Sequence, residues 1–157
     1  MKLKLLVIGK TDDLYLQTGI QKFEARLKHY LTFEMIVIPD IKNSKNLSET
    51  QQKAKEGEAL LAQIESPDTV ILLDENGNQN SSREFSIFLQ KQMLSGCKNL
   101  IFIIGGPYGF SPEIYSRANG KISLSKMTFS HQMVRLIFVE QLYRAMTILK
   151  NEPYHHD

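Results

Sequence analysis

The hydrophobic positions of the chain form short continuous runs, separated by stretches in which apolar residues recur with a helical period. The runs are residues 2–8, 33–38, 69–74, 99–104 and 121–125. Apolar runs of this length, bounded by Gly, Pro, Asp or Ser, predict β-strands. Because the most apolar of these strands are continuous aliphatic runs and helical segments separate the strands, the pattern predicts a parallel sheet that helices cover on both faces. The third and fourth runs are the most apolar and are expected inside the sheet.

Helices are predicted between and after these strands. Ser48 with Gln51 and Ser81 with Glu84 have the spacing of capping boxes, which open helices. The expected helices are residues 14–30, 48–64 and 81–93, a short helix from Pro112, and a last helix capped by Ser130 that runs to about Lys150. This order predicts one α/β domain over residues 1–157, with an open, mostly parallel sheet and helices on both faces.

The last helix is apolar around most of its circumference. Its apolar residues are Met133, Val134, Leu136, Ile137, Phe138, Val139, Leu142, Tyr143 and Met146. Such a helix is buried on most sides. We therefore expect a homodimer with this helix in the interface; the alternative is that the helix lies deep within the monomer. Glu140 and Arg144 lie four residues apart on it, which predicts an ion pair within a structural network.

Composition limits the possible environments and partners. The chain has one cysteine, Cys97, so it forms no internal disulfide and fits a reducing cytoplasm. Its opening apolar stretch, residues 5–8, is too short for a signal peptide or a membrane span. The net charge of +2 is small for a protein that binds RNA by charge alone. His155 and His156 are adjacent and Cys97 has no fitting spacing, so no metal site is expected.

A glycine-rich segment follows the fourth strand. Gly105-Gly106-Pro107 and Gly109 differ from both the dinucleotide-binding fingerprint and the P-loop. In parallel sheets, ligands bind beyond the carboxyl ends of the strands. We therefore expect "LDENG" after the third strand, "GGPYG" after the fourth and "SLSKMTF" after the fifth to meet around a ligand, with the glycines leaving the main chain accessible.

Three longer stretches carry a family resemblance. "KLKLLVIGK" (2–10), "IGGPYGFSP" (104–112) and "LSKMTFSHQMVRLIFVEQLYRAMTILKNEPYH" (124–155) resemble the bacterial family of ribosomal RNA large-subunit methyltransferase H, in the SPOUT superfamily. The resemblance covers essentially all of residues 1–157. It implies that S-adenosylmethionine methylates N3 of a pseudouridine in 23S rRNA. It also implies a homodimer and a deep C-terminal trefoil knot.

The resemblance also implies roles for individual residues. Cofactor contacts are expected from Leu73, Gly105, Leu124, Ser125, Lys126, Met127, Thr128 and Phe129. His131, together with Tyr154 and His155 from the partner subunit, is expected at the methyl-transfer centre. Loss of the N3 proton has two explanations, which the sequence leaves open. Either His131 or His155 acts as a weak base, or a nearby cationic group stabilises the anion. His156 stands where many relatives carry Arg or Lys, so an RNA contact at 156 stays open.

The small net charge favours an assembled ribosome over naked RNA as the substrate. Two other functions remain as alternatives. One is a SPOUT methyltransferase that acts on tRNA, and the other is a non-catalytic factor that binds ribosomes or assists their assembly.

Overall fold

The sheet of the computed structural model, which describes residues 1–157, has five strands in the order β2–β1–β4–β3–β5. All neighbouring strands are parallel. The strands are β1 (Lys2–Ile8), β2 (Thr32–Ile38), β3 (Thr69–Gln79), β4 (Asn99–Ile104) and β5 (Gly120–Ser123). The third and fourth strands lie inside the sheet, with β4 at its centre, as the apolar runs predicted.

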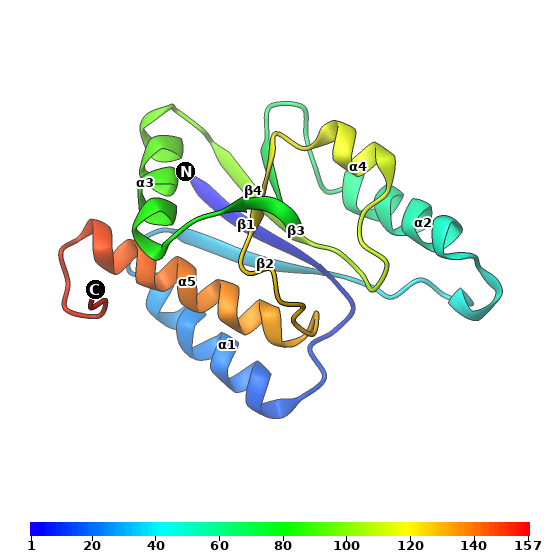
Figure 1. Ribbon diagram of the computed structural model, residues 1–157, viewed down its shortest axis with the longest axis horizontal. Coiled ribbons are helices and arrows are strands. Elements are labelled where there is room, and N and C mark those ends of the chain that lie inside the picture. The colour runs from blue at the N-terminus through cyan, green and yellow to red at the C-terminus, as the bar shows by residue number, and fades with distance from the viewer.

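Helices cover both faces of the sheet (Figure 1). The helices are α1 (Leu14–Leu27), α2 (Glu49–Leu61), α3 (Ser82–Leu94), α4 (Pro112–Arg117) and α5 (Met133–Leu149), with a 3-10 turn at Ser44–Asn46. Side chains of α1, α3 and α5 share one hydrophobic core with Leu100, Phe102 and Ile104 of β4. Those of α2 and α4 pack with Ile101 and Ile103 on the opposite face. The continuous apolar runs are therefore explained by burial on both sides.

Helix α5 packs between α1 and α3 against the sheet. Phe138, Val139, Leu142 and Ala145 have no exposed surface, and the Phe138 ring lies 4.8 Å from that of Phe102. Much of the apolar circumference of this helix is thus buried within one chain. The homodimer therefore stays a prediction, and so does the C-terminal knot.

The largest difference from the predicted elements lies in β3. The sequence predicted a strand that ends at Asp74, whereas β3 continues to Gln79. The strand has an irregularity between Leu73 and Asn78, both of which pair with Ile122 of β5. Gly77 lies in this excursion, where a Cβ would be 2.7 Å from the Ile122 backbone. Residues typical of a turn here form a bulge, and the strand resumes beyond it.

Helix boundaries differ by a few residues. Both predicted capping boxes, at Ser48 and Ser81, are present. Helix α5 begins at Met133, and Ser130 instead caps a preceding turn by accepting the Met133 N–H at 3.0 Å. None of the helices has the length and apolar character needed to cross a membrane.

Candidate active site

A pocket of about 840 Å³ opens at the irregularity within β3 and at the ends of β4 and β5. Its walls are residues 73–76 of β3, residues 104–110 from the end of β4 onward, and residues 123–125 and 127–131 from the end of β5 onward, with Glu49, Lys53, Tyr115 and Val134 also lining it. The carboxyl edge of the parallel sheet therefore brings together the three segments that the sequence pointed to.

Most of the predicted cofactor contacts line this pocket. They are Leu73, Gly105, Leu124, Ser125, Met127, Thr128 and Phe129, and the exposed His131 lies beside them. Lys126 does not line the pocket, and neither do Tyr154 and His155. The binding and catalytic roles of all these residues stay predictions.

The glycine turn, residues 105–109, forms one wall of the pocket. Gly109 has a φ of +83°, a conformation that glycine adopts without strain, and its N–H donates to the Gly106 carbonyl at 3.2 Å. A Cβ on Gly105 would lie 3.1 Å from the Phe110 ring, and one on Gly106 would lie 2.4 Å from the Glu56 carboxylate. A side chain at Gly105 would therefore shift the Phe110 ring by a few tenths of an ångström, and one at Gly106 would displace the Glu56 carboxylate.

A hydrogen bond between Tyr115 and Asp74 joins α4 to the irregular part of β3 beside the pocket. The Tyr115 hydroxyl donates to Asp74 Oδ2 at 2.5 Å, and the other carboxylate oxygen accepts the Asn76 N–H at 2.8 Å. Burial and this bond to a carboxylate raise the pKa of Tyr115 to about 12. The pair fixes the position of Asp74, whose carboxylate lies at the wall of the pocket. The sequence analysis did not identify Tyr115, because no local pattern links it to Asp74.

The loop between β5 and α5 is held by short polar contacts. Ser123 Oγ donates to the Ser125 carbonyl at 2.9 Å, and Ser125 Oγ accepts the Met127 N–H at 2.9 Å. Met127 and Phe129 nonetheless stay exposed, at 77% and 37%. The loop therefore has a defined backbone and presents apolar side chains at the mouth of the pocket.

Arg135 anchors the start of α5 to the end of β1. Only 1% of its surface is exposed. Its guanidinium donates to the carbonyls of Ile8, Gly9 and His131 at 2.7, 2.9 and 3.1 Å, and to Thr11 Oγ1 at 3.1 Å. Burial lowers the pKa of Arg135, yet a guanidinium keeps its charge in proteins. Arg135 thereby fixes the backbone of His131, and the sequence analysis assigned it no role.

The C-terminal tail lies at the opposite end of α5 from His131. The Tyr154 ring packs 4.7 Å from the Tyr143 ring, and its hydroxyl donates to Glu140 Oε1 at 3.0 Å. Arg144 Nη2 pairs with the same carboxylate at 2.7 Å, which confirms the network predicted for Glu140 and Arg144. Burial and the Glu140 bond raise the pKa of Tyr154.

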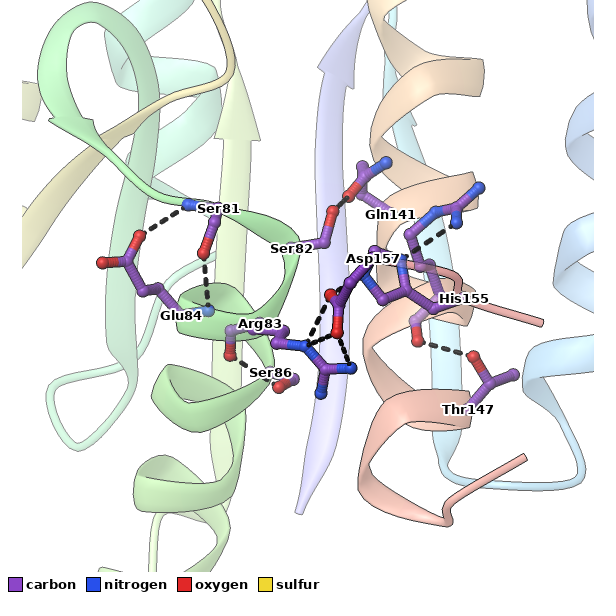
Figure 2. A network of polar contacts seen from close by, with 10 residues as sticks. Ser81, Ser82, Arg83, Glu84, Ser86, Gln141, Thr147, His155 and Asp157 are labelled. Atoms are coloured by element: carbon purple, nitrogen blue, oxygen red, sulfur yellow. Dashed lines mark hydrogen bonds and ion pairs between the residues drawn. The ribbon is translucent and has the colours of Figure 1, made fainter. Parts of the chain in front are cut away.

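His155 and Asp157 continue this network to α3 (Figure 2). Arg144 Nη1 lies 3.2 Å from His155 Nδ1, and His155 Nε2 lies 3.1 Å from Asp157 Oδ1. A guanidinium only donates, so Nδ1 accepts and the imidazole proton sits on Nε2, facing the carboxylate. Asp157 also pairs with Arg83, which lowers the pKa of the Asp157 carboxyl. In this position neither ring nitrogen of His155 is free to take a proton from a substrate.

No group of three or more His, Cys, Asp or Glu residues is placed so that it could hold an ion. The polar side chains at the pocket are carboxylates, hydroxyls, the Asn76 amide, one lysine and one histidine.

Comparisons with known proteins agree over the full length of the chain. A family model described as "Predicted SPOUT methyltransferase" matches residues 1–155. A protein from Christiangramia forsetii named "Ribosomal RNA large subunit methyltransferase H" is 63% identical over 156 residues, which cover 99% of each chain. The protein of the same name from Parabacteroides distasonis is 60% identical over 157 residues, covering 100% of each.

One solved structure also superposes on the chain. It is the SpoU methyltransferase AviRb from Streptomyces viridochromogenes in complex with AdoMet, with a TM-score of 0.49 and 13% sequence identity. The match covers 96% of this chain and 59% of that one. At that TM-score the likeness supports no inference.

Proposed function

The chain belongs to the SPOUT methyltransferase family, and from that premise we propose that it transfers a methyl group from S-adenosylmethionine to N3 of a pseudouridine in 23S rRNA. The observation that carries the proposal is the pocket that three separate segments form at the carboxyl edge of the sheet. The relatives that match almost the whole chain, named for methylation of the large-subunit ribosomal RNA, support the choice of substrate.

The pocket has the size and chemistry that the methyl donor requires. Its volume of about 840 Å³ lies in the range of roughly 300–1,000 Å³ typical of ligand sites. Leu73, Ile104 and Leu124 offer apolar surface for an adenine ring, and the glycine turn offers backbone groups for its edge. The carboxylates of Glu49 and Asp74 offer countercharge for a cationic ligand.

The work left to the protein is alignment and removal of one proton. The bound donor supplies an electrophilic methyl group, so no metal is needed. The residues of the pocket must hold that methyl in line with N3, which is the larger source of rate enhancement. The imide proton has a pKa near that of a phenol, about 10, so a weak base suffices. His131, exposed beside the pocket, is our candidate for this base.

Tyr154 and His155 are assigned to the pocket of a second copy of the chain. Helix α5, 17 residues long, separates them from His131 in their own chain. At 1.5 Å per residue the helix spans about 25 Å, too far for a single site. A homodimer in which each tail reaches its partner's pocket would bring both halves together. Both ring nitrogens of His155 are already hydrogen-bonded, so His155 does not serve as the base. In this arrangement Tyr154 and His155 instead contact the RNA.

The modest charge of the chain favours an assembled ribosome as the substrate. With a net charge of +2 per chain, the protein has little excess charge to hold naked RNA. Ribosomal shape and neighbouring ribosomal proteins would then supply the remaining recognition surface.

The decisive test uses ribosomes that lack the modification. Ribosomes from cells without this gene are incubated with the protein and labelled S-adenosylmethionine, and the methyl group is mapped on the RNA. We expect one label at N3 of a pseudouridine in 23S rRNA, and a much weaker reaction with protein-free RNA. A label in tRNA, or none in any RNA, would contradict the proposal.

A further inference from the structure

Glu56 is a buried carboxylate on α2. Only 3% of its surface is exposed. Its Oε1 atom has no hydrogen-bond partner, and its Oε2 atom has only the Gln52 amide, at 3.5 Å. Burial raises the pKa of this carboxyl group, and the charge of Asp40 acts in the same direction. A buried polar group with an unmet oxygen destabilises a fold, so packing alone does not account for Glu56.

The carboxylate lies directly against the glycine turn. A Cβ on Gly106 would be 2.4 Å from Glu56 Oε2 and 2.7 Å from Oε1, so the carboxylate occupies the space that a side chain at Gly106 would need. Glu56 itself does not line the pocket, although Glu49 and Lys53 of the same helix do. Glu56 therefore supports the turn without reaching the pocket.

The turn carries hydrogen-bond donors that match the unmet acceptor. Its Gly109 N–H donates to the Gly106 carbonyl at 3.2 Å, and the two glycines form an isolated antiparallel bridge. The backbone of this turn lies against a buried carboxylate that has a free acceptor oxygen. A small movement of the turn would let that oxygen accept a backbone N–H, and a ligand in the pocket would contact the turn directly.

We propose that Glu56 is a positioning residue for the methyl donor, whose carboxylate braces the glycine turn and accepts one of its N–H groups when the pocket is filled. The inference rests on the proposed function, because it requires that the donor bind against this turn. It also gives Gly106 a specific purpose, since only glycine lets the carboxylate reach the backbone.

Two substitutions of the same kind on one helix test the inference. Glu56→Gln keeps the shape of the side chain and replaces one acceptor oxygen with an N–H donor group. Glu58→Gln makes the same change at an exposed position of α2 and serves as the control. Affinities for S-adenosylmethionine are measured by calorimetry, together with thermal unfolding and the ¹⁵N amide shifts of Gly105, Gly106 and Gly109.

We expect Glu56→Gln to weaken donor binding about tenfold, the effect of roughly one hydrogen bond to a charged group. Its melting temperature should not fall, because the unpaired charge is removed. Glu58→Gln should bind within about twofold of the wild type. Donor affinity in Glu56→Gln equal to that of the wild type would overturn the inference.

Donor binding by the wild type separates this inference from the proposed function. If the wild type does not bind the donor, the proposed function fails and the brace fails with it. If the wild type binds the donor but Glu56→Gln binds it equally well, the brace alone fails. A Gly106 amide shift that moves on donor binding in the wild type and not in Glu56→Gln supports the brace. If Glu56→Gln does not fold, Gly106→Ala is the second test, because its methyl group would displace the Glu56 carboxylate from the turn. That variant should also bind the donor about tenfold more weakly, and unchanged affinity there would refute the brace.

Discussion

Replacing Arg135 with methionine should destabilise the protein more than any ordinary surface substitution. The guanidinium makes four hydrogen bonds in a site that is 1% exposed, and the carbonyls of Ile8 and Gly9 receive two of them. Methionine fills a similar space, so the loss of stability comes from the missing hydrogen bonds and from the carbonyl acceptors that stay buried without a donor. Hydrogen bonds to charged groups contribute about 1.5–3 kcal/mol each, offset in part by the cost of burying the charge.

The net loss should be about 3–5 kcal/mol, out of a typical total stability of roughly 5–15 kcal/mol. For a chain of this length each kcal/mol lowers the melting temperature by about 2–4 °C, so a fall of about 6–20 °C is expected. Arg135→Lys should lose less, because an ammonium group keeps the charge but cannot reach all four acceptors at once.

Urea unfolding followed by circular dichroism measures the effect, with the slope of the transition checked for two-state behaviour. Lys150→Met, at the exposed end of the same helix, is the matched control and should stay within about 0.5 kcal/mol of the wild type. A loss below about 1 kcal/mol for Arg135→Met would refute the reasoning, since the four bonds would then add almost nothing to stability. Because Arg135 also holds the His131 carbonyl, slower methyl transfer by Arg135→Lys is expected even where the fold persists.

Four further outcomes follow from the structure. Gly105→Val should weaken donor binding at least about tenfold in calorimetry, and it should also cost roughly 1–3 kcal/mol of stability by crowding the adjacent ring; full affinity would exclude the turn from the site. Ile137→Glu, on the half-buried face of α5, should convert a dimer of twice 18.0 kDa into monomers by light scattering, and a monomeric wild type would contradict the dimer. Tyr115→Phe should flatten the alkaline loss of stability, because a pKa raised to about 12 gives stability that is complete below about pH 10 and lost between there and pH 12; identical alkaline unfolding curves would refute this. Mixing His131→Ala chains with chains that lack residues 153–157 should restore some methyl transfer, and inactive mixed dimers would refute a shared site.

The sheet could be predicted from sequence because its signal is local. The central strand β4 and the first half of β3 are continuous apolar runs, because burial on both faces keeps polar residues out of them. The rule that ligands bind at the carboxyl ends of parallel strands then located the three segments of the pocket. The same local reasoning ended β3 too early, since the polar residues after Leu73 are typical of a turn. Their return to the sheet depends on Ile122, which is far away in the chain.

The supports around the pocket could not be predicted because each depends on contacts between distant residues. Arg135 donates to Ile8 across 127 positions of the chain, and Tyr115 donates to Asp74 across 41. Glu56 resembles any other acidic residue of an amphipathic helix until the glycine turn is placed against it. A charge at a buried helical position is the one sequence signal available, and it indicates a partner without identifying it.

The distance between His131 and the tail limits how two chains could share a site. On the proposal that the protein is a homodimer, its interface is isologous, so the same surface of each copy meets about a two-fold axis. An axis parallel to α5 would set tail beside tail and leave both pockets without one. An axis perpendicular to α5 would run the two helices antiparallel and bring each tail towards the other chain's His131. The contacts of Tyr154 with Glu140 and of Asp157 with Arg83 then hold the tail in shape on its own chain, while it is presented to the partner. A shared site therefore requires antiparallel α5 helices, and a crosslink between cysteines introduced at positions 133 and 148 of different chains would form in that arrangement alone.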